Sequence, residues 1–135
     1  MTRLLLDTHA LLWWWSDEAL LPPRVRETLS DADTTVFVSA ASAWEIATKV
    51  RLGRLAPYRD VVPRFGELAM AADLRHLPLT HQQGLRAGSY PNEHRDPFDR
   101  MLAAQAELES LTLVTRDAAF QDFPVQVLWQ HEHPA

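Results

Sequence analysis

Short apolar runs alternate with segments of helical periodicity along this chain, and this alternation constrains the fold more than any other feature. The first run, Leu4-Leu5-Leu6, ends at Asp7, and a helical pattern follows it through Trp15. Strand-to-helix repeats build parallel sheets, and wholly apolar strands fit a sheet that is covered on both faces. We therefore predict an α/β fold in which helices cover a parallel sheet.

The boundaries of the predicted elements come from hydrophobic periodicity and from capping residues. Ser39 is a good N-cap for a helix that ends before Gly53, and Asp96-Pro97 is a strong helix start. We expect residues 88–95 to form an exposed loop. Strands are predicted over 4–6, 35–38, 77–79, 111–115 and 125–129; helices are predicted over 10–15, 22–29, 39–52, 58–72 and 96–108, with short helical segments after residue 80 and over 117–121.

Length and composition limit the class of protein. At 135 residues we expect one domain over residues 1–130, followed by a flexible tail over 131–135. The absence of cysteine excludes disulfides and thiolate metal sites, and no apolar run approaches the length of a membrane span or a signal peptide. We therefore expect a cytoplasmic protein that does not associate with membranes.

Four acidic residues lie where an α/β fold places its ligands, outside the carboxyl ends of the strands. Asp7 follows the first strand, Glu45 lies in the second turn of a helix, Asp99 lies in the first turn of another, and Asp117 follows a late strand. Each has an ordinary structural alternative. Asp7 and Asp117 are suited to capping helices, Glu45 to pairing with Lys49, and Asp99 to complementing a helix dipole.

Carboxylates that converge without countercharges raise one another's pKa, so a stable cluster needs a cation. Ligation by oxygen alone selects Mg2+ or Mn2+ over zinc. Such ions activate water and stabilise a leaving oxygen, which is the chemistry of phosphodiester hydrolysis. The formal net charge of −5 opposes broad attraction of nucleic acid. A nuclease with this charge requires bound cations or local basic residues, for which the candidates are Arg51, Arg54, Arg95, Arg100 and Arg116.

Four ordered segments resemble the motifs of PIN-domain ribonucleases, and within that family the VapC toxins. They are Leu5-Leu6-Asp7-Thr8-His9-Ala10-Leu11-Leu12, Ser39-Ala40-Ala41-Ser42-Ala43-Trp44-Glu45-Ile46, Asp96-Pro97-Phe98-Asp99-Arg100-Met101-Leu102-Ala103-Ala104-Gln105-Ala106 and Leu113-Val114-Thr115-Arg116-Asp117. The resemblance implies a three-layer α/β/α fold with a mainly parallel sheet. It also implies an endoribonuclease dependent on Mg2+ or Mn2+, a VapB-type antitoxin as partner, and a homodimer.

The same resemblance assigns roles to particular residues. Asp7, Glu45 and Asp99 match the principal metal-site acids, and Asp117 matches a fourth, more variable one. Asp96 is the competing position for Asp99, and we interpret it as the helix cap, because Asp99 has the family's spacing to the following aliphatic-Ala-Ala triplet. The candidates for substrate binding or for orienting the acids are Thr8, Ser39, Arg100, Thr115 and Arg116.

The sequence also bears on two other functions. A phosphatase of the haloacid dehalogenase type requires a second aspartate two residues after the first, where this chain has His9. A non-catalytic interaction module with the same fold is the other alternative. Consecutive helical residues differ by about 100° in direction, so Trp13, Trp14 and Trp15 cannot all be buried. We expect at least one of them at the surface, in contact with an antitoxin or a second protomer.

Overall fold

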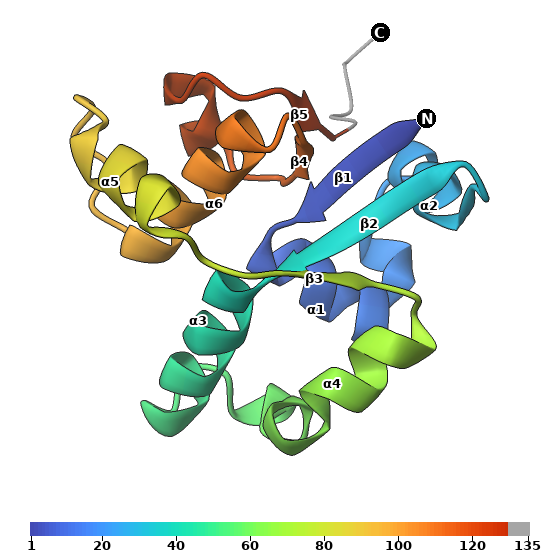
Figure 1. Cartoon of the computed structure of the whole chain (residues 1–135). Coiled ribbons are helices and arrows are strands. Elements are labelled where there is room, and N and C mark those ends of the chain that lie inside the picture. The colour runs from blue at the N-terminus through green and yellow to red at the C-terminus, as the bar shows by residue number, and fades with distance from the viewer. Residues whose placement is uncertain (130–135) are drawn as a thin grey trace, which may run out of the picture.

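The computed structural model describes residues 1–129, and the tail predicted over 131–135 lies outside the described residues. Strands and helices alternate along the chain as the sequence predicts (Figure 1). The elements are β1 (Thr2–Leu6), α1 (Thr8–Ser16), η1 (Glu18–Leu20), α2 (Pro23–Ser30), β2 (Thr34–Ser39), α3 (Ala40–Arg51), η2 (Ala56–Tyr58), α4 (Val61–Ala71), β3 (Arg75–Leu77), α5 (His81–Ser89), α6 (Pro97–Leu108), β4 (Thr112–Val114), η3 (Ala118–Asp122) and β5 (Val127–Leu128).

The five strands form one sheet in the order β3-β2-β1-β4-β5, and every pair is parallel. The prediction of a mainly parallel sheet is confirmed. The strands after β1 are added first on one side and then on the other, so the strand order reverses between β1 and β4. Parallel α/β sheets bind ligands at the carboxyl edge of such a reversal point. The Asp7 N–H donates to the carbonyl of Val114 at 3.0 Å, which fixes the end of β1 against β4 at this point.

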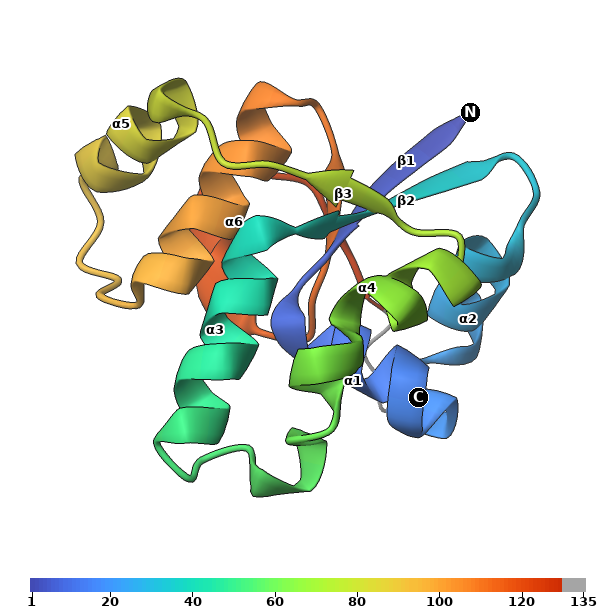
Figure 2. The same cartoon turned by 60° about the horizontal axis from the view of Figure 1, so that its bottom comes forward.

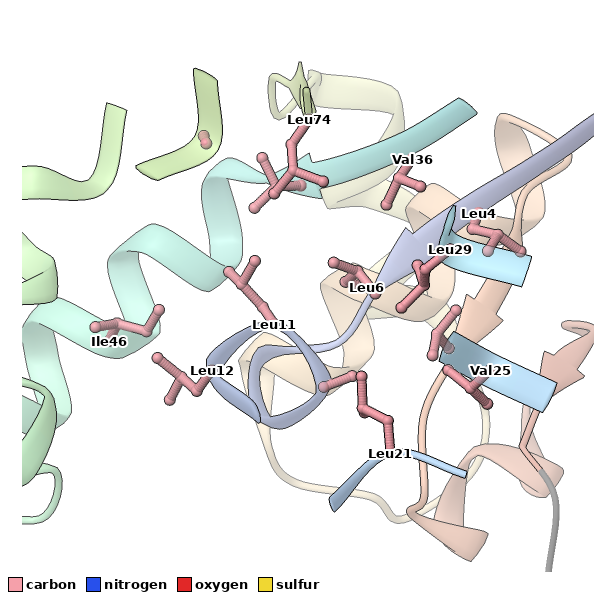
Figure 3. Close-up of a cluster of buried hydrophobic side chains, with 14 residues drawn as sticks. Leu4, Leu6, Leu11, Leu12, Leu21, Val25, Leu29, Val36, Ile46 and Leu74 are labelled. Carbon is pink, nitrogen blue, oxygen red and sulfur yellow. The ribbon is translucent and has the colours of Figure 1, made fainter. Parts of the chain in front are cut away.

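Helices cover both faces of the sheet and make the fold three-layered (Figure 2). A hydrophobic cluster lies on each face. Successive side chains of a strand point to opposite faces. Leu4 and Leu6 of β1 therefore enter the cluster beneath α1 to α4, shown in Figure 3, whereas Leu5 enters the cluster beneath α5 and α6. The predicted α/β/α architecture is confirmed, and the wholly apolar strand is explained by burial on both faces.

Several boundaries differ from prediction, and two of these differences have a local cause. The third strand lies at 75–77 instead of 77–79, because Thr80 forms a capping box with Gln83 and commits the chain to α5. Helix α5 also continues through Gly88 to Ser89, inside the predicted loop, because Ala87 is buried against α6 and the Ser89 hydroxyl bonds back to the Leu85 carbonyl. The connection to α6 is correspondingly shorter.

Gly53 occupies the position after the end of α3 with a φ of +77°, as predicted from its place behind the last helical residue. Side chains that need a negative φ would be strained there. Within residues 1–129, no helix has the length and apolar character needed to cross a lipid bilayer.

Candidate active site

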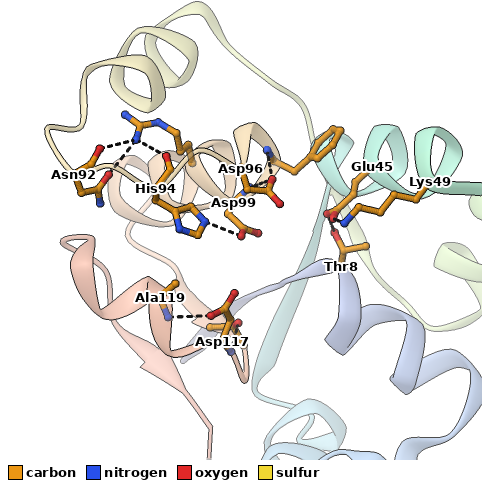
Figure 4. Close-up of polar contacts among 12 residues, drawn as sticks. Thr8, Glu45, Lys49, Asn92, His94, Asp96, Asp99, Asp117 and Ala119 are labelled. Atoms are coloured by element: carbon orange, nitrogen blue, oxygen red, sulfur yellow. Dashed lines mark hydrogen bonds and ion pairs between the residues drawn. The ribbon is translucent and has the colours of Figure 1, made fainter. Parts of the chain in front are cut away.

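The four predicted acids come from four elements and lie around one edge of the molecule. Asp7 caps α1, Glu45 lies on α3, Asp99 lies in the first turn of α6, and Asp117 caps η3. Figure 4 shows Glu45, Asp99 and Asp117 extending into the same region. The negative charge of Glu45 raises the pKa of both Asp7 and Asp99, so Glu45 interacts electrostatically with each of them.

Asp7 is buried, with 8% of its surface exposed. Its Oδ1 accepts the Ala10 N–H at 2.7 Å, so the residue also serves as the N-cap predicted for it. Burial raises the pKa of the Asp7 carboxyl, while hydrogen bonds from Thr115 and from the Ala10 backbone lower it in part. A carboxyl group at the end of a buried strand is thus held where its charged form is costly, unless a cation approaches.

Glu45 is the most deeply buried of the four acids, with 3% of its surface exposed. The Thr8 hydroxyl donates to Glu45 Oε1 at 2.5 Å, and Lys49 forms an ion pair with Oε2. The ion pair with Lys49, which the sequence offers as an ordinary structural role for Glu45, is present in the structure. It does not replace a site role, because Lys49 occupies one carboxylate oxygen and supplies positive charge at an otherwise acidic edge.

Asp99 is half-buried, and burial raises its pKa to about 6. This value also includes the nearby charges of Asp96 and Glu45, which raise the pKa, and a hydrogen bond with His94, which lowers it. His94 Nε2 lies 2.9 Å from Asp99 Oδ2 (Figure 4). Asp96 Oδ1 instead accepts the backbone N–H groups of Phe98 and Asp99, which confirms the cap role predicted for Asp96.

Asp117 differs from the other acids because it is exposed. Its Oδ1 accepts the Ala119 N–H at 2.9 Å, and its own N–H donates to Thr115 Oγ1 at 3.0 Å. An open pocket of about 430 Å³ joins Asp117 to Asp7. Asp117 therefore lies at the mouth of this pocket, and its supporting role stays a prediction.

Two residues predicted to bind substrate make hydrogen bonds within the protein itself. The Arg100 guanidinium donates to the backbone carbonyls of Ala87, Tyr90, Asn92 and His94 and to the Asn92 side chain. Through these bonds Arg100 holds the loop between α5 and α6, and few of its donors remain for an RNA phosphate. Its contact with substrate stays a prediction. Ser39 caps α3 and donates to Gln105 Oε1 at 2.5 Å, in a buried position.

The other predicted contact residues lie close to the acids. Thr8 is bonded to Glu45 and Thr115 to Asp7, so both orient carboxyl groups. Arg116 is exposed and lines the pocket beside Asp7 and Asp117. Of the five arginines proposed to attract RNA, Arg116 is the one that shares this pocket with two of the acids.

His94 and Gln105 belong to the site region but were not singled out from the sequence. Gln105 is fully buried and connects Ser39 with the Pro78 carbonyl and Gln83. His94 precedes Asp99 by five residues across a loop. A polar residue on the apolar side of the predicted 96–108 helix was the available signal for Gln105, whereas the loop conformation that brings His94 to Asp99 has no sequence signature.

The acids fit a hard divalent cation chemically, although they do not form a closed coordination sphere. Among the described residues, no three His, Asp or Glu side chains lie close enough together to hold a metal ion in this structure. The fit rests on the donors: carboxylate oxygens are the ligands Mg2+ and Mn2+ prefer, and burial penalises the charge on Asp7 and Asp99. A bound cation would relieve that penalty.

Comparison with known proteins places these observations in a family. Residues 4–126 match the PIN domain. The chain is 27% identical to ribonuclease VapC22 of Mycobacterium tuberculosis over 99% of this chain and 95% of that protein. The structure resembles VapBC-1 of nontypeable Haemophilus influenzae with a TM-score of 0.70 at 17% identity, over 94% of this chain and 97% of that one.

A further structure, FitAcB of Neisseria gonorrhoeae, matches with a TM-score of 0.60 at 26% identity, covering 92% of this chain and 95% of that one. The resemblance to VapC-type proteins drawn from the four motifs is therefore confirmed. Because the family match covers nearly all of the described fold, the chain belongs to the PIN domain family.

Proposed function

We propose that this protein is a VapC-type endoribonuclease that depends on Mg2+ or Mn2+ and acts as the toxin of a toxin–antitoxin pair. The observation that carries the proposal is the placement of Asp7, Glu45 and Asp99 at one edge of the sheet, where the negative charge of Glu45 raises the pKa of both aspartates. Membership of the PIN domain family and the whole-length similarity to a ribonuclease support it.

In this proposal Asp7, Glu45 and Asp99 hold the metal and Asp117 contributes from the mouth of the pocket. When bound, the metal supplies an activated water and stabilises the charge that develops on the phosphate. Thr8 and Thr115 keep two of the carboxylates oriented, as their hydrogen bonds indicate. Lys49 and Arg116 supply positive charge for an anionic substrate on a chain whose net charge is −5.

The proposed partners follow from the same relationship. The related structures include VapBC assemblies, and we infer that a VapB-type antitoxin covers this site and that the toxin is a homodimer. The substrate is an RNA, and we expect a site in a tRNA or ribosomal RNA, which places the activity in the cytoplasm.

The test is cleavage of a pool of tRNA and ribosomal RNA by the purified chain with Mg2+, with Mn2+ or with a chelator. We expect metal-dependent cleavage that falls by about a hundredfold or more in Asp7→Asn and Asp99→Asn, since even outer partners of a metal ligand are worth 10- to 100-fold. Asp60→Asn is the matched control, because Asp60 is exposed and makes no side-chain capping bond. Equal cleavage by all four proteins would show that the activity does not depend on these acids and would overturn the proposed metal site, and absence of cleavage by all four would favour a non-catalytic PIN-like module.

A further inference from the structure

The pocket beside the acids has an aromatic wall that the proposed metal chemistry does not use. It is lined by Asp7, His9, Trp13, Arg116, Asp117 and Ala118. Asp7 and Asp117 form its acidic side. The other side comes from α1, where His9 and Trp13 are one helical turn apart and therefore share a face.

The aromatic rings along this wall are in contact but are not stacked flat on one another. The ring centroids of His9 and Trp13 are 6.0 Å apart with the planes inclined by 55°, and those of Trp13 and Trp129 are 6.1 Å apart at 52°. Trp13 is half-buried, and its base packs on the hydrophobic cluster beneath α1. The indole is thus held in place by its neighbours, while among residues 1–129 its ring partners are tilted and none lies parallel to its face.

Arg116 gives this pocket a positive charge. The residue is exposed, and within residues 1–129 its guanidinium makes no ion pair comparable to those of Lys49, Arg64 and Arg86. An arginine in this condition keeps its planar fork available for a phosphate, which it binds through two parallel hydrogen bonds.

We propose that this pocket is a nucleobase subsite, in which an unpaired base of the RNA stacks on Trp13 while Arg116 contacts a neighbouring phosphate. The inference rests on the proposed function and adds a substrate class to it. Aromatic side chains with adjacent cationic groups are the usual platform for single-stranded RNA, because every base has a stacking face. A base within a duplex already has both faces covered, so the RNA at this site is single-stranded.

The position of the pocket favours RNA over a protein partner as its occupant. It opens directly onto Asp7 and Asp117, so a base bound there would place its own phosphate group next to the acids. The three tryptophans of α1 also point in different directions. Trp14 lines a separate pocket with Arg26, and Trp15 packs edge-on against Phe65 at 5.3 Å, so only Trp13 reaches the acids.

The test compares Trp13→Leu, Trp13→Phe and Trp14→Leu in the full chain, each combined with Asp99→Asn to prevent cleavage. Binding of a short fluorescent single-stranded RNA of mixed sequence is measured by anisotropy in Mg2+, alongside the same strand in a duplex. Trp14→Leu is a matched control because both tryptophans are half-buried on the same helix and pack on the same cluster. Thermal unfolding of each variant shows whether it is folded.

We expect Trp13→Leu to weaken binding of the single strand by about tenfold or more, since stacking of one base is worth that much or more. Trp13→Phe retains a ring face and is expected to recover most of the affinity, Trp14→Leu to bind like the parent, and the duplex to be insensitive to Trp13→Leu. Equal losses in Trp13→Leu and Trp14→Leu, or no loss in Trp13→Leu, would overturn the subsite.

A cleavage assay separates this inference from the function on which it rests. Metal-dependent cleavage by the natural chain, together with unchanged single-strand binding by Trp13→Leu, overturns the subsite alone. Absence of metal-dependent cleavage, together with Trp13-dependent binding, overturns the nuclease and supports the subsite as a site of RNA binding.

Discussion

Single residues at this site stabilise the fold and are also candidates for the proposed chemistry. Asp7 caps α1 and is also a candidate metal ligand, and Glu45 is an ion-pair partner of Lys49 as well as a site acid. The structural alternatives considered from the sequence are therefore present in the molecule without excluding the functional ones. A carboxylate has enough acceptor positions for both.

Asp99 makes the stability of the metal-free protein depend on pH. Its pKa of about 6 lies above the ordinary value of 3.8, so its contribution to stability is fully present below pH 3.8 and is lost as the pH rises through about 6. Asp99→Asn removes the charge that causes this loss. We expect the variant to gain stability relative to the natural chain as the pH rises from 3.8 through about 6 in chelator, measured by urea unfolding. A difference that does not change with pH would contradict this assignment.

Arg100 is expected to contribute to the structure. Arg100→Lys keeps the charge but loses the fork that binds several carbonyl groups, so we expect a loss of about 1–3 kcal/mol in unfolding free energy. Faster amide exchange over residues 90–96 should accompany it. Arg95→Lys, at an exposed arginine, is the control and should change neither quantity. If Arg100→Lys weakened RNA binding with no loss of stability, the predicted contact of Arg100 with substrate would be supported instead.

At the scale of elements, a buried polar connection sets the distance between the helices that carry Glu45 and Asp99. Ser39 at the start of α3 donates to Gln105 on α6, and Gln105 in turn donates to Gln83 on α5 and to the Pro78 carbonyl. The rings of Trp44 and Phe98 also meet edge-on between α3 and α6, with centroids 4.7 Å apart. The acids are thus positioned by helix-to-helix contacts as well as by the sheet.

Gln105→Leu tests this connection. The substitution preserves approximate size but removes the acceptor of the Ser39 hydroxyl and the donor to Gln83 Oε1 and the Pro78 carbonyl, so we expect a loss of about 3 kcal/mol. Gln82→Leu, at an exposed glutamine of α5, should lie within about 0.5 kcal/mol of the natural chain. Chemical denaturation of both variants measures the difference, and similar stabilities would show that the buried connection contributes little.

At the scale of the whole molecule, the site connects metal binding to folding. The acids come from elements that are distant in sequence, so a cation that binds them binds only the folded chain. Such a ligand stabilises by about 2.7 kcal/mol when present at a hundred times its Kd. We expect Mg2+ or Mn2+ to raise the thermal midpoint and a chelator to reverse the rise.

Two variants make this measurement specific. Asp7→Asn should abolish the stabilisation by Mn2+, because it removes a proposed ligand, whereas Asp60→Asn should retain it, because Asp60 is exposed and outside the site. The same rise in all three proteins would point to nonspecific binding by an acidic chain and would contradict the proposed ligands.

The sequence by itself determined the features that depend on neighbouring residues. Alternation of apolar runs and helical periodicity predicted the parallel α/β/α architecture, and Ser39, Gly53 and Asp96 predicted helix ends that the structure shares. Periodicity and capping act within a few residues, so they can be identified without knowing the fold. The four ordered motifs likewise indicated the family, and they contain the four acids predicted for the site.

Only the tertiary structure decided which polar groups remain free. The carbonyls that occupy Arg100, the approach of His94 to Asp99 and the buried bonds of Gln105 all depend on how a loop and three helices meet. The direction of each tryptophan of α1 was decided in the same way, and one of them faces the acids. Hydrogen bonds between distant segments depend on packing of the whole chain, and for that reason residue type and spacing did not predict them.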